Sequence, residues 1–270
     1  MNAAATQNAL NNLSYTHLAA GPSDFWLHLT RLGEIQLLLP LALLAAVYLW
    51  RRSVPASDCL GQRLARRWLA GLGLAVALTA ASKLAFFGWG IGSAVWDFTG
   101  ISGHAMASAA ILPCLAWCAA RGRPAFTQRL AVGLAMSLAA LIAYSRLKVG
   151  AHSPSEVVAG FVLGMVVSVL SLRGALALPA VGLAPPLALP LALVAALTLL
   201  PLGAPKSRTH DAVIQLALKL SGRSVPFVRA DLQRRPRLEQ APLNAVSTSR
   251  SGSRPTPGPT VATAMDPTPR

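Results

Sequence analysis

The sequence predicts an all-α polytopic membrane bundle of about six transmembrane helices, and three observations support this fold class. Of the 270 residues, 54% are hydrophobic and only 12% are charged, with a mean hydropathy of +0.52. This composition departs far from that of soluble proteins. Six apolar segments approach the length of about 20 residues that a spanning helix needs. Positive charges lie in separate groups between the apolar segments, as in membrane proteins.

The six apolar segments follow one another along the chain. Their approximate ranges are 35–50, 68–87, 104–120, 130–144, 156–172 and 178–202. The first and the fourth are short for a span, so their boundaries can be wrong by several residues. The sixth contains five prolines, which should kink its helix or shorten the regular part.

Composition divides the chain into four parts. Residues 1–33 are predicted to be an N-terminal extramembrane segment, and residues 34–203 the six-span membrane domain. Residues 204–240 form a basic tail, in which the stretch 209–220 has apolar side chains at helical intervals and Gly222 follows as a stop signal. Residues 241–270 are rich in Ser, Thr, Pro and Gly, and we expect them to be disordered.

The basic residues of the short loops predict the orientation. Residues 51–67 hold five arginines, residues 121–129 hold three, and Arg173 follows the fifth segment. These positions alternate along the chain and therefore share one side, which should be the cytoplasm. The opposite loops, residues 88–103 and 145–155, then both face outward. In a bacterium they would face the periplasm from the inner membrane.

Charge and cysteine content argue against two other classes of function. The formal net charge is +15, but the basic residues are dispersed rather than gathered on one surface, so we expect no nucleic-acid partner. Cys114 and Cys118 lie four residues apart within an apolar segment. We interpret them as buried small hydrophobic residues rather than as a disulfide or a metal site.

The outward loop 88–103 ends at a candidate anion site. Ser102 precedes a helical segment and suits an N-cap, Gly103 allows close backbone approach, and His104 lies in the first turn. Free amides at a helix start, helped by the helix dipole, bind anions. The alternative is a plain helix cap with a histidine at the membrane interface.

The second outward loop brings ionisable side chains together. Arg146 offers a planar fork for phosphate oxygens, Lys148 a second cation, and His152 a nucleophile or base. Glu156, four residues further on, could hold the imidazole of His152 in one tautomer. Two alternatives stay open: Glu156 could complete a capping box with Ser153, or the His and Glu could bind zinc with His104 as the one visible further ligand.

Lys83 lies about one turn before the outward end of the second segment. Its side chain could extend to the membrane interface. It could equally place its ammonium in a pocket shared with both outward loops.

These residues together resemble the type 2 phosphatidic acid phosphatase superfamily, whose signatures are K-x6-R-P, P-S-G-H and S-R-x5-H-x3-D. The third matches as Ser145-Arg146, His152 and Glu156, with Glu for the usual Asp. The second matches as Ser102-Gly103-His104, after Ile101 in place of Pro.

The first signature is present only in part. Lys83 fits its lysine, but the Arg and Pro positions fall on Gly90 and Ile91. Loss of one donor to the phosphate would remove about 2 to 4 kcal/mol of transition-state stabilisation if nothing replaced it. The activity of this chain is therefore in question even if its fold is that of the family.

The resemblance implies a six-helix membrane phosphatase, with roles for particular residues. His152 would attack phosphorus, His104 would protonate the leaving group and later activate water, and Glu156 would orient His152. The phosphate oxygens would be bound by Lys83, Ser102, Gly103 and Arg146, with Lys148 auxiliary. No metal or cofactor is implied. The implied substrates are lipid phosphates such as phosphatidic acid, phosphatidylglycerol phosphate or polyprenyl diphosphate.

Two alternatives to that activity remain. The chain could bind anionic lipid head groups without turnover, or it could act on soluble phosphate esters. Vanadate-dependent haloperoxidases share the histidine site, but they are soluble proteins and six spans argue against that activity.

Overall fold

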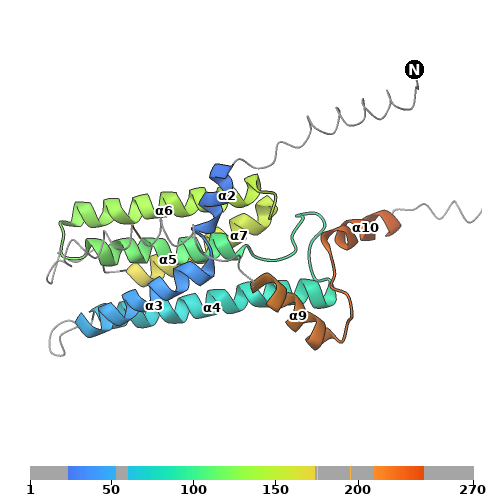
Figure 1. Ribbon diagram of the computed structural model, residues 1–270, viewed down its shortest axis with the longest axis horizontal. Helices are drawn as coiled ribbons and strands as arrows, with labels where there is room; N and C mark the ends of the chain where they lie inside the picture. The colour runs from blue at the N-terminus through green and yellow to red at the C-terminus, as the bar shows by residue number, and fades with distance from the viewer. Residues whose placement is uncertain (1–23, 53–59, 174, 176–194, 196–208, 240–270) are drawn as a thin grey trace, which may run out of the picture. The chain divides into compact units, whose positions relative to one another are not determined.

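The computed structural model describes residues 24–52, 60–173, 175, 195 and 209–239, and most of these are helical (Figure 1). The helices are α2 (Asp24–Arg31), α3 (Ile35–Arg52), α4 (Leu60–Trp89), α5 (Gly103–Ala120), α6 (Ala125–Lys148), α7 (Pro154–Leu172), α9 (Thr209–Ser221) and α10 (Arg229–Glu239). Among the described residues, one isolated antiparallel bridge joins Ser93 and Phe98. The predicted all-α class is confirmed. The chain divides into two compact units after Gln233, within α10.

Five stretches are long and apolar enough to cross a membrane, which makes the chain a multi-pass membrane protein. They are Asp24–Arg51, Gly61–Trp89, Gly103–Ala120, Ala125–Lys148 and Pro154–Leu172. Each contains one of the first five predicted segments. The sixth predicted segment, residues 178–202, lies outside the described residues, as do residues 1–23 and the predicted disordered residues 241–270.

Helix α5 forms the centre of the bundle, where it packs against α3, α4, α6 and α7. Nearly all of its residues are buried, including four alanines between positions 105 and 110. On α7, Gly160 lies against the carbonyl oxygen of Ser102 and Gly164 against that of Met106, with no room for a Cβ atom. Small residues at helix contacts allow this close backbone approach in membrane bundles.

The outer surface of the bundle is apolar. Large hydrophobic side chains are exposed on the spanning helices, among them Leu44, Leu74, Leu78, Leu134, Val158 and Val169. Exposed apolar surface on this scale is unfavourable in water, whereas it is the natural surface of a helix in lipid. Composition and burial therefore agree on a membrane environment.

Two helices extend beyond the ranges predicted for them. Helix α6 runs from Ala125 to Lys148 rather than over residues 130–144, so Ser145 and Arg146 lie in its last turns and not in a loop. Helix α4 begins at Leu60, which places three arginines of the predicted cytoplasmic loop on a helix. Hydropathy marks only the part of a helix inside the hydrocarbon, and the polar ends continue past it.

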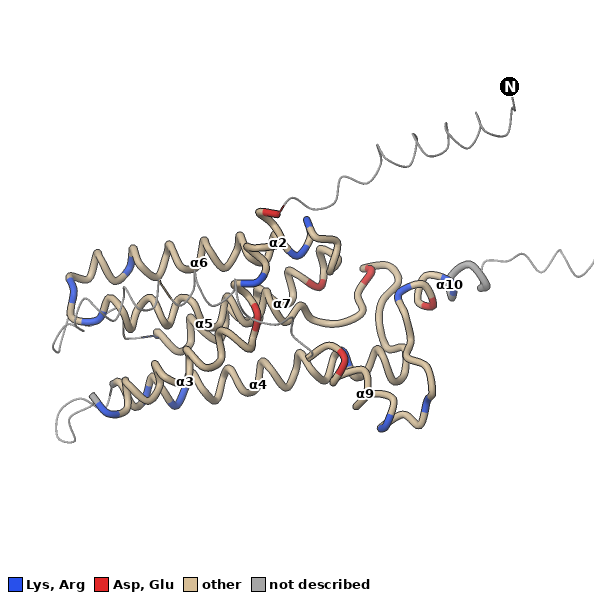
Figure 2. Tube along the Cα trace, viewed as in Figure 1, with Lys and Arg blue, Asp and Glu red and all other residues tan. Residues whose placement is uncertain are grey.

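Consecutive spanning helices alternate in direction, so the end of α4, the start of α5, the end of α6 and the start of α7 lie together. We refer to this as the site end of the bundle. The arginines at the end of α3, at the start of α4 and between α5 and α6 lie at the other end (Figure 2). Helix α9 packs on α4, with the ring of His210 edge-on to that of Phe87 at a centroid distance of 5.4 Å. Helix α7 thus ends at the opposite end of the bundle, whereas α9 begins near the site end.

Candidate active site

The sequence-predicted residues converge at the site end of the bundle from four helices. Lys83 lies near the end of α4, Ser102 to His104 at the start of α5, Arg146 in the last turn of α6, His152 between α6 and α7, and Glu156 in the first turn of α7. Loop residues 90–102 and the turn 149–153 belong to the same end, as the sequence predicted. Segments more than fifty residues apart therefore contribute to one site.

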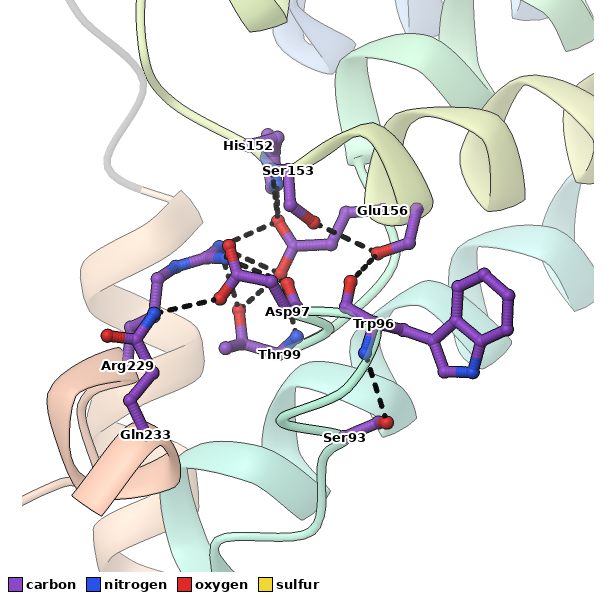
Figure 3. A network of polar contacts seen from close by, with 10 residues as sticks. Ser93, Trp96, Asp97, Thr99, His152, Ser153, Glu156, Arg229 and Gln233 are labelled. Atoms are coloured by element: carbon purple, nitrogen blue, oxygen red, sulfur yellow. Dashed lines mark hydrogen bonds and ion pairs between the residues drawn. The ribbon is translucent and has the colours of Figure 1, made fainter. Parts of the chain in front are cut away.

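The centre of the site is a pair formed by His152 and Glu156 (Figure 3). Nδ1 of His152 lies 2.7 Å from Oε2 of Glu156, whose side chain is fully buried. The same Oε2 accepts a hydrogen bond of 3.2 Å from the backbone N–H of Ser153. One carboxylate thus completes the capping box of α7 and holds the imidazole, so the two interpretations of Glu156 are both satisfied.

The other partners of Glu156 determine which nitrogen of His152 carries the proton. Oε1 accepts hydrogen bonds from the backbone N–H and the hydroxyl of Thr99, at 2.7 and 2.5 Å. Arg229 donates to both carboxylate oxygens, at 2.9 and 3.0 Å. A carboxyl group surrounded by donors is ionised and accepts at every contact. Nδ1 of His152 is therefore the donor, and the lone pair of the neutral ring is on Nε2.

His152 is poised as a neutral imidazole. Burial lowers its pKa below the ordinary value near 6.5, and the hydrogen bond to Glu156 opposes that effect only in part. The charges of Lys83 and Arg146 act in the same direction as burial. Near neutral pH the ring therefore keeps the free Nε2 lone pair that a nucleophile needs.

A second imidazole and two cations surround this pair. The charges of Arg146, His152 and Lys83 all act on the ring of His104, and Lys83 interacts with Arg146 and Glu156. Such mutual influence requires that the groups lie close together. The described residues contain no cluster of three or more His, Cys, Asp or Glu side chains that could hold a metal ion.

Donors at the site are left without a protein partner among the described residues. The hydroxyl of Ser102 is fully buried and unpaired, as is Nε of Arg146. Ser102 occupies the N-cap position of α5, as predicted, but its side chain makes no capping hydrogen bond. The first amides of α5 have no acceptor within their helix. Buried donors without partners are costly, so these groups are candidates to bind an oxyanion.

Similarity to known proteins agrees with this geometry. Residues 87–178 match the family model of the PAP2 superfamily. The chain is 38% identical over 147 residues to a Klebsiella pneumoniae protein described as "Uncharacterized 22.5 kDa protein in cps region", and the match covers 54% of this chain and 68% of that one. No solved structure matches the chain.

The chain belongs to the PAP2 superfamily. This is the superfamily of type 2 phosphatidic acid phosphatases, so the resemblance stated from the three signatures is confirmed. The family generally comprises phosphatases, and at that level the chain is of phosphoric ester hydrolase type.

The residue that departs from the first PAP2 signature, Gly90, lies at the end of a helix. Gly90, at the position of the signature arginine, ends helix α4 with a left-handed φ of 67°. Its N–H donates to the carbonyl oxygen of Phe86 at 2.7 Å, which is a glycine-type helix C-cap. The residue at this position therefore closes a helix rather than extending a side chain toward the site.

The signature lysine is covered by the loop that follows α4. Gly100, at φ 149°, lies so close that a Cβ atom there would come within 2.9 Å of Cγ of Lys83. The N–H of Ile101 donates to the hydroxyl of Ser82 at 3.0 Å, which fixes the loop in this place. Coverage by the loop favours the pocket interpretation of Lys83 over extension to the interface.

Lys148 has different surroundings from the other predicted residues. Its ammonium lies 5.3 Å from the centroid of the Tyr144 ring, and its side chain is exposed. Residues two positions apart on a helix point to nearly opposite faces. The side chains of Arg146 and Lys148 therefore point in different directions.

Sequence reasoning missed supports at both ends of the described chain. Nη1 of Arg146 donates to the hydroxyl of Thr30 on α2 at 2.7 Å, and a Cβ atom on Gly33 would lie 3.3 Å from the Cβ of His104. Arg229 of α10 contacts Glu156. No motif marks Thr30 or Gly33. For Arg229 there was one signal, because six spans would put the basic tail on the outer side, which runs against the usual charge distribution.

Proposed function

We propose that the protein is an integral membrane phosphatase that hydrolyses lipid phosphate monoesters or diphosphates through a phosphohistidine intermediate. The observation that carries the proposal is the 2.7 Å contact between His152 Nδ1 and Glu156 Oε2, at a site where His104 and two cations gather. Phosphoryl transfer asks mainly for positioning and for stabilisation of spread negative charge. The site offers both.

The reaction would proceed in two steps. Nε2 of His152 attacks phosphorus as the bond to the leaving oxygen breaks, and His104 donates the proton that the leaving alcohol or phosphate needs. His104, now neutral, takes a proton from water, which attacks the phosphohistidine and releases inorganic phosphate. The mechanism consumes only water and needs neither a metal nor a cofactor, because His152 supplies the nucleophile and His104 the acid and base.

The phosphate oxygens would be bound by the unpaired donors of the site. These are Nε of Arg146, the hydroxyl of Ser102 and the amide of Gly103, with the ammonium of Lys83 beside them. Lys148 would act from outside this group. Donors placed in advance stabilise the charge that develops at the transition state.

The position of the site supports the proposed substrate class. The catalytic groups are at the ends of helices with apolar outer surfaces, and beside the end of a spanning helix a phospholipid would place its head group. Phosphatidic acid, phosphatidylglycerol phosphate and polyprenyl diphosphate all present phosphate there. The arginines at the opposite end favour an outward-facing site. Because the Klebsiella relative is bacterial, we propose the inner membrane, with the site facing the periplasm.

The test is phosphate release by the purified full-length chain from a panel of these lipids in detergent. His152→Ala should abolish release and also abolish acid-labile phosphate bound to the protein after a rapid quench. His28→Ala is the matched control, since His28 is exposed on α2. Undiminished release by His152→Ala would remove this mechanism. Release confined to soluble phosphate esters would replace the substrate class.

A second candidate function is binding of anionic lipid head groups without turnover. Gly90 at the position of the signature arginine favours it, because one phosphate donor is missing there. This candidate predicts saturable binding of lipid phosphates with no phosphohistidine for any substrate in the panel.

A further inference from the structure

Arg229 connects three segments that are far apart in the sequence (Figure 3). Its Nη2 lies 2.9 and 3.0 Å from the two carboxylate oxygens of Glu156. Its Nη1 lies 2.6 Å from Oδ2 of Asp97 and 2.8 Å from the carbonyl oxygen of the same residue. One guanidinium thus joins α10, the loop after α4 and the start of α7.

The position of Arg229 is fixed by hydrogen bonds of the two residues that precede it. The N–H of Phe227 donates to the carbonyl oxygen of Phe87 at 3.0 Å, which attaches the connection between α9 and α10 to the end of α4. The N–H of Val228 donates to Oδ2 of Asp231 at 3.0 Å, which caps the start of α10. Gly88 lets α9 approach, because a Cβ there would lie 3.3 Å from the carbonyl oxygen of Ala217.

Asp97 shows that the loop is held in an unfavourable conformation. Its φ is 48°, in the left-handed region that non-glycine residues seldom adopt. Such conformations persist where surrounding contacts over-determine them, and they cluster at functional sites. Here the contacts come from Arg229, and the neighbouring Thr99 donates twice to Glu156. The loop, the carboxylate and Arg229 therefore form one connected unit behind His152.

We propose that Arg229 is a positioning residue for the His152–Glu156 pair, so that the C-terminal segment of the chain is part of the active site. The guanidinium fork fixes the plane of the Glu156 carboxylate, and that plane fixes the ring of His152. The fork also balances the charge of Glu156 and so limits how strongly this carboxylate can favour a protonated ring. This inference rests on the proposed function.

The sign of the electrostatic effect can be stated in advance. The charged groups that face His152 are Glu156 on α7, Lys83 on α4 and Arg146 on α6, with His104 on α5 beside it and Arg229 behind Glu156. Removal of the positive charge of Arg229 leaves the negative charge of Glu156 less balanced, and this favours the protonated ring of His152. The acid limb of the pH profile should then move to higher pH.

The experiment compares Arg229→Gln and Arg229→Lys with the full-length wild type. Lys219→Gln is the matched control, because Lys219 is an exposed cation on α9. Arg229→Gln should lower kcat about 10- to 100-fold through misalignment of the nucleophile, with little change in KM, and raise the acid limb by about half to one pH unit. Arg229→Lys should keep the acid limb but recover only part of kcat, because a lysine retains the charge without the fork.

A second measurement separates this inference from the proposed function. Carbethoxylation of histidine by diethyl pyrocarbonate reports the neutral ring without any turnover, and the difference from His152→Ala isolates His152. A raised titration midpoint in Arg229→Gln, absent in Lys219→Gln, supports the inference even if no lipid is hydrolysed. An unchanged midpoint overturns it, whether kcat and the melting temperature stay the same or fall together. Absence of phosphohistidine in the wild type would overturn the proposed function and leave the inference about Arg229 intact.

Discussion

The signature-bearing helices and the segments that flank them contribute to the site in different ways. Helices α4 to α7 supply the groups suited to chemistry, such as His152 and Arg146, and each lies in a recognisable motif. The flanking helices α2 and α10 supply contacts that hold those groups, through Thr30 and Arg229. The difference shows that the reactive groups belong to recognisable sequence motifs, whereas their alignment depends on single residues elsewhere in the chain.

The sharpest test of this division lies within the signature region. Glu156→Gln replaces an acceptor of six contacts by an amide that must direct its NH2 group at existing donors. If the amide donates to Nδ1 of His152, the free lone pair moves from Nε2 to the wrong nitrogen. We expect kcat to fall about 10³- to 10⁴-fold, as when the acid behind a catalytic histidine becomes an amide.

Phosphate release under steady-state conditions measures this effect. Asp211→Asn, an exposed acid on α9, makes the same chemical change away from the site and should retain full activity. Activity of Glu156→Gln close to that of the control would mean that Glu156 serves only to cap α7.

A second prediction concerns the packing that carries the signature residues. Gly160→Ala places a methyl group against the carbonyl oxygen of Ser102 and 3.3 Å from the Cβ of Ala105, so α5 and α7 must separate. We expect kcat to fall about 10- to 100-fold as Ser102 and Glu156 move apart, together with a lower melting temperature. Gly133→Ala on α6 meets nothing within 4 Å and should keep or raise stability. Equal behaviour of the two variants would show that close approach of α5 and α7 is unimportant.

A third prediction uses the pH dependence of the reaction. The neutral ring of His152 is the nucleophile, so kcat/KM should fall about tenfold per pH unit below the pKa of His152. Burial lowers that pKa, which places the acid limb below pH 6.5. A profile measured with a lipid phosphate in detergent checks this. A limb centred above pH 7 would contradict a neutral His152 at rest.

The smallest expected effect tests the flanking helix α2. Thr30→Val removes the acceptor for Nη1 of Arg146 and keeps the side-chain volume. Loss of one such hydrogen bond is worth about 1 kcal/mol, so we expect KM to rise severalfold with a smaller change in kcat. Thr30→Ser keeps the hydroxyl and should resemble the wild type. If both variants bind substrate equally well, α2 does not support Arg146.

Much of the fold and the core of the site could be predicted from the sequence, for identifiable reasons. Hydropathy locates spans because lipid requires long apolar helices. The signatures locate His104, Arg146 and His152 because these residues belong to short motifs of fixed spacing. Helix ends were wrong at α4 and α6, since polar turns continue beyond the hydrocarbon. Thr30 and Arg229 could not be assigned, because each acts through one long-range contact that leaves no pattern in the chain.

The glycine that ends α4 limits which residues can occupy position 90 without strain. An arginine at position 90 would have to adopt φ 67°, a conformation that costs a side-chain-bearing residue about 1 to 2 kcal/mol. A change to the arginine of the family signature at this position would therefore strain the turn that follows the helix.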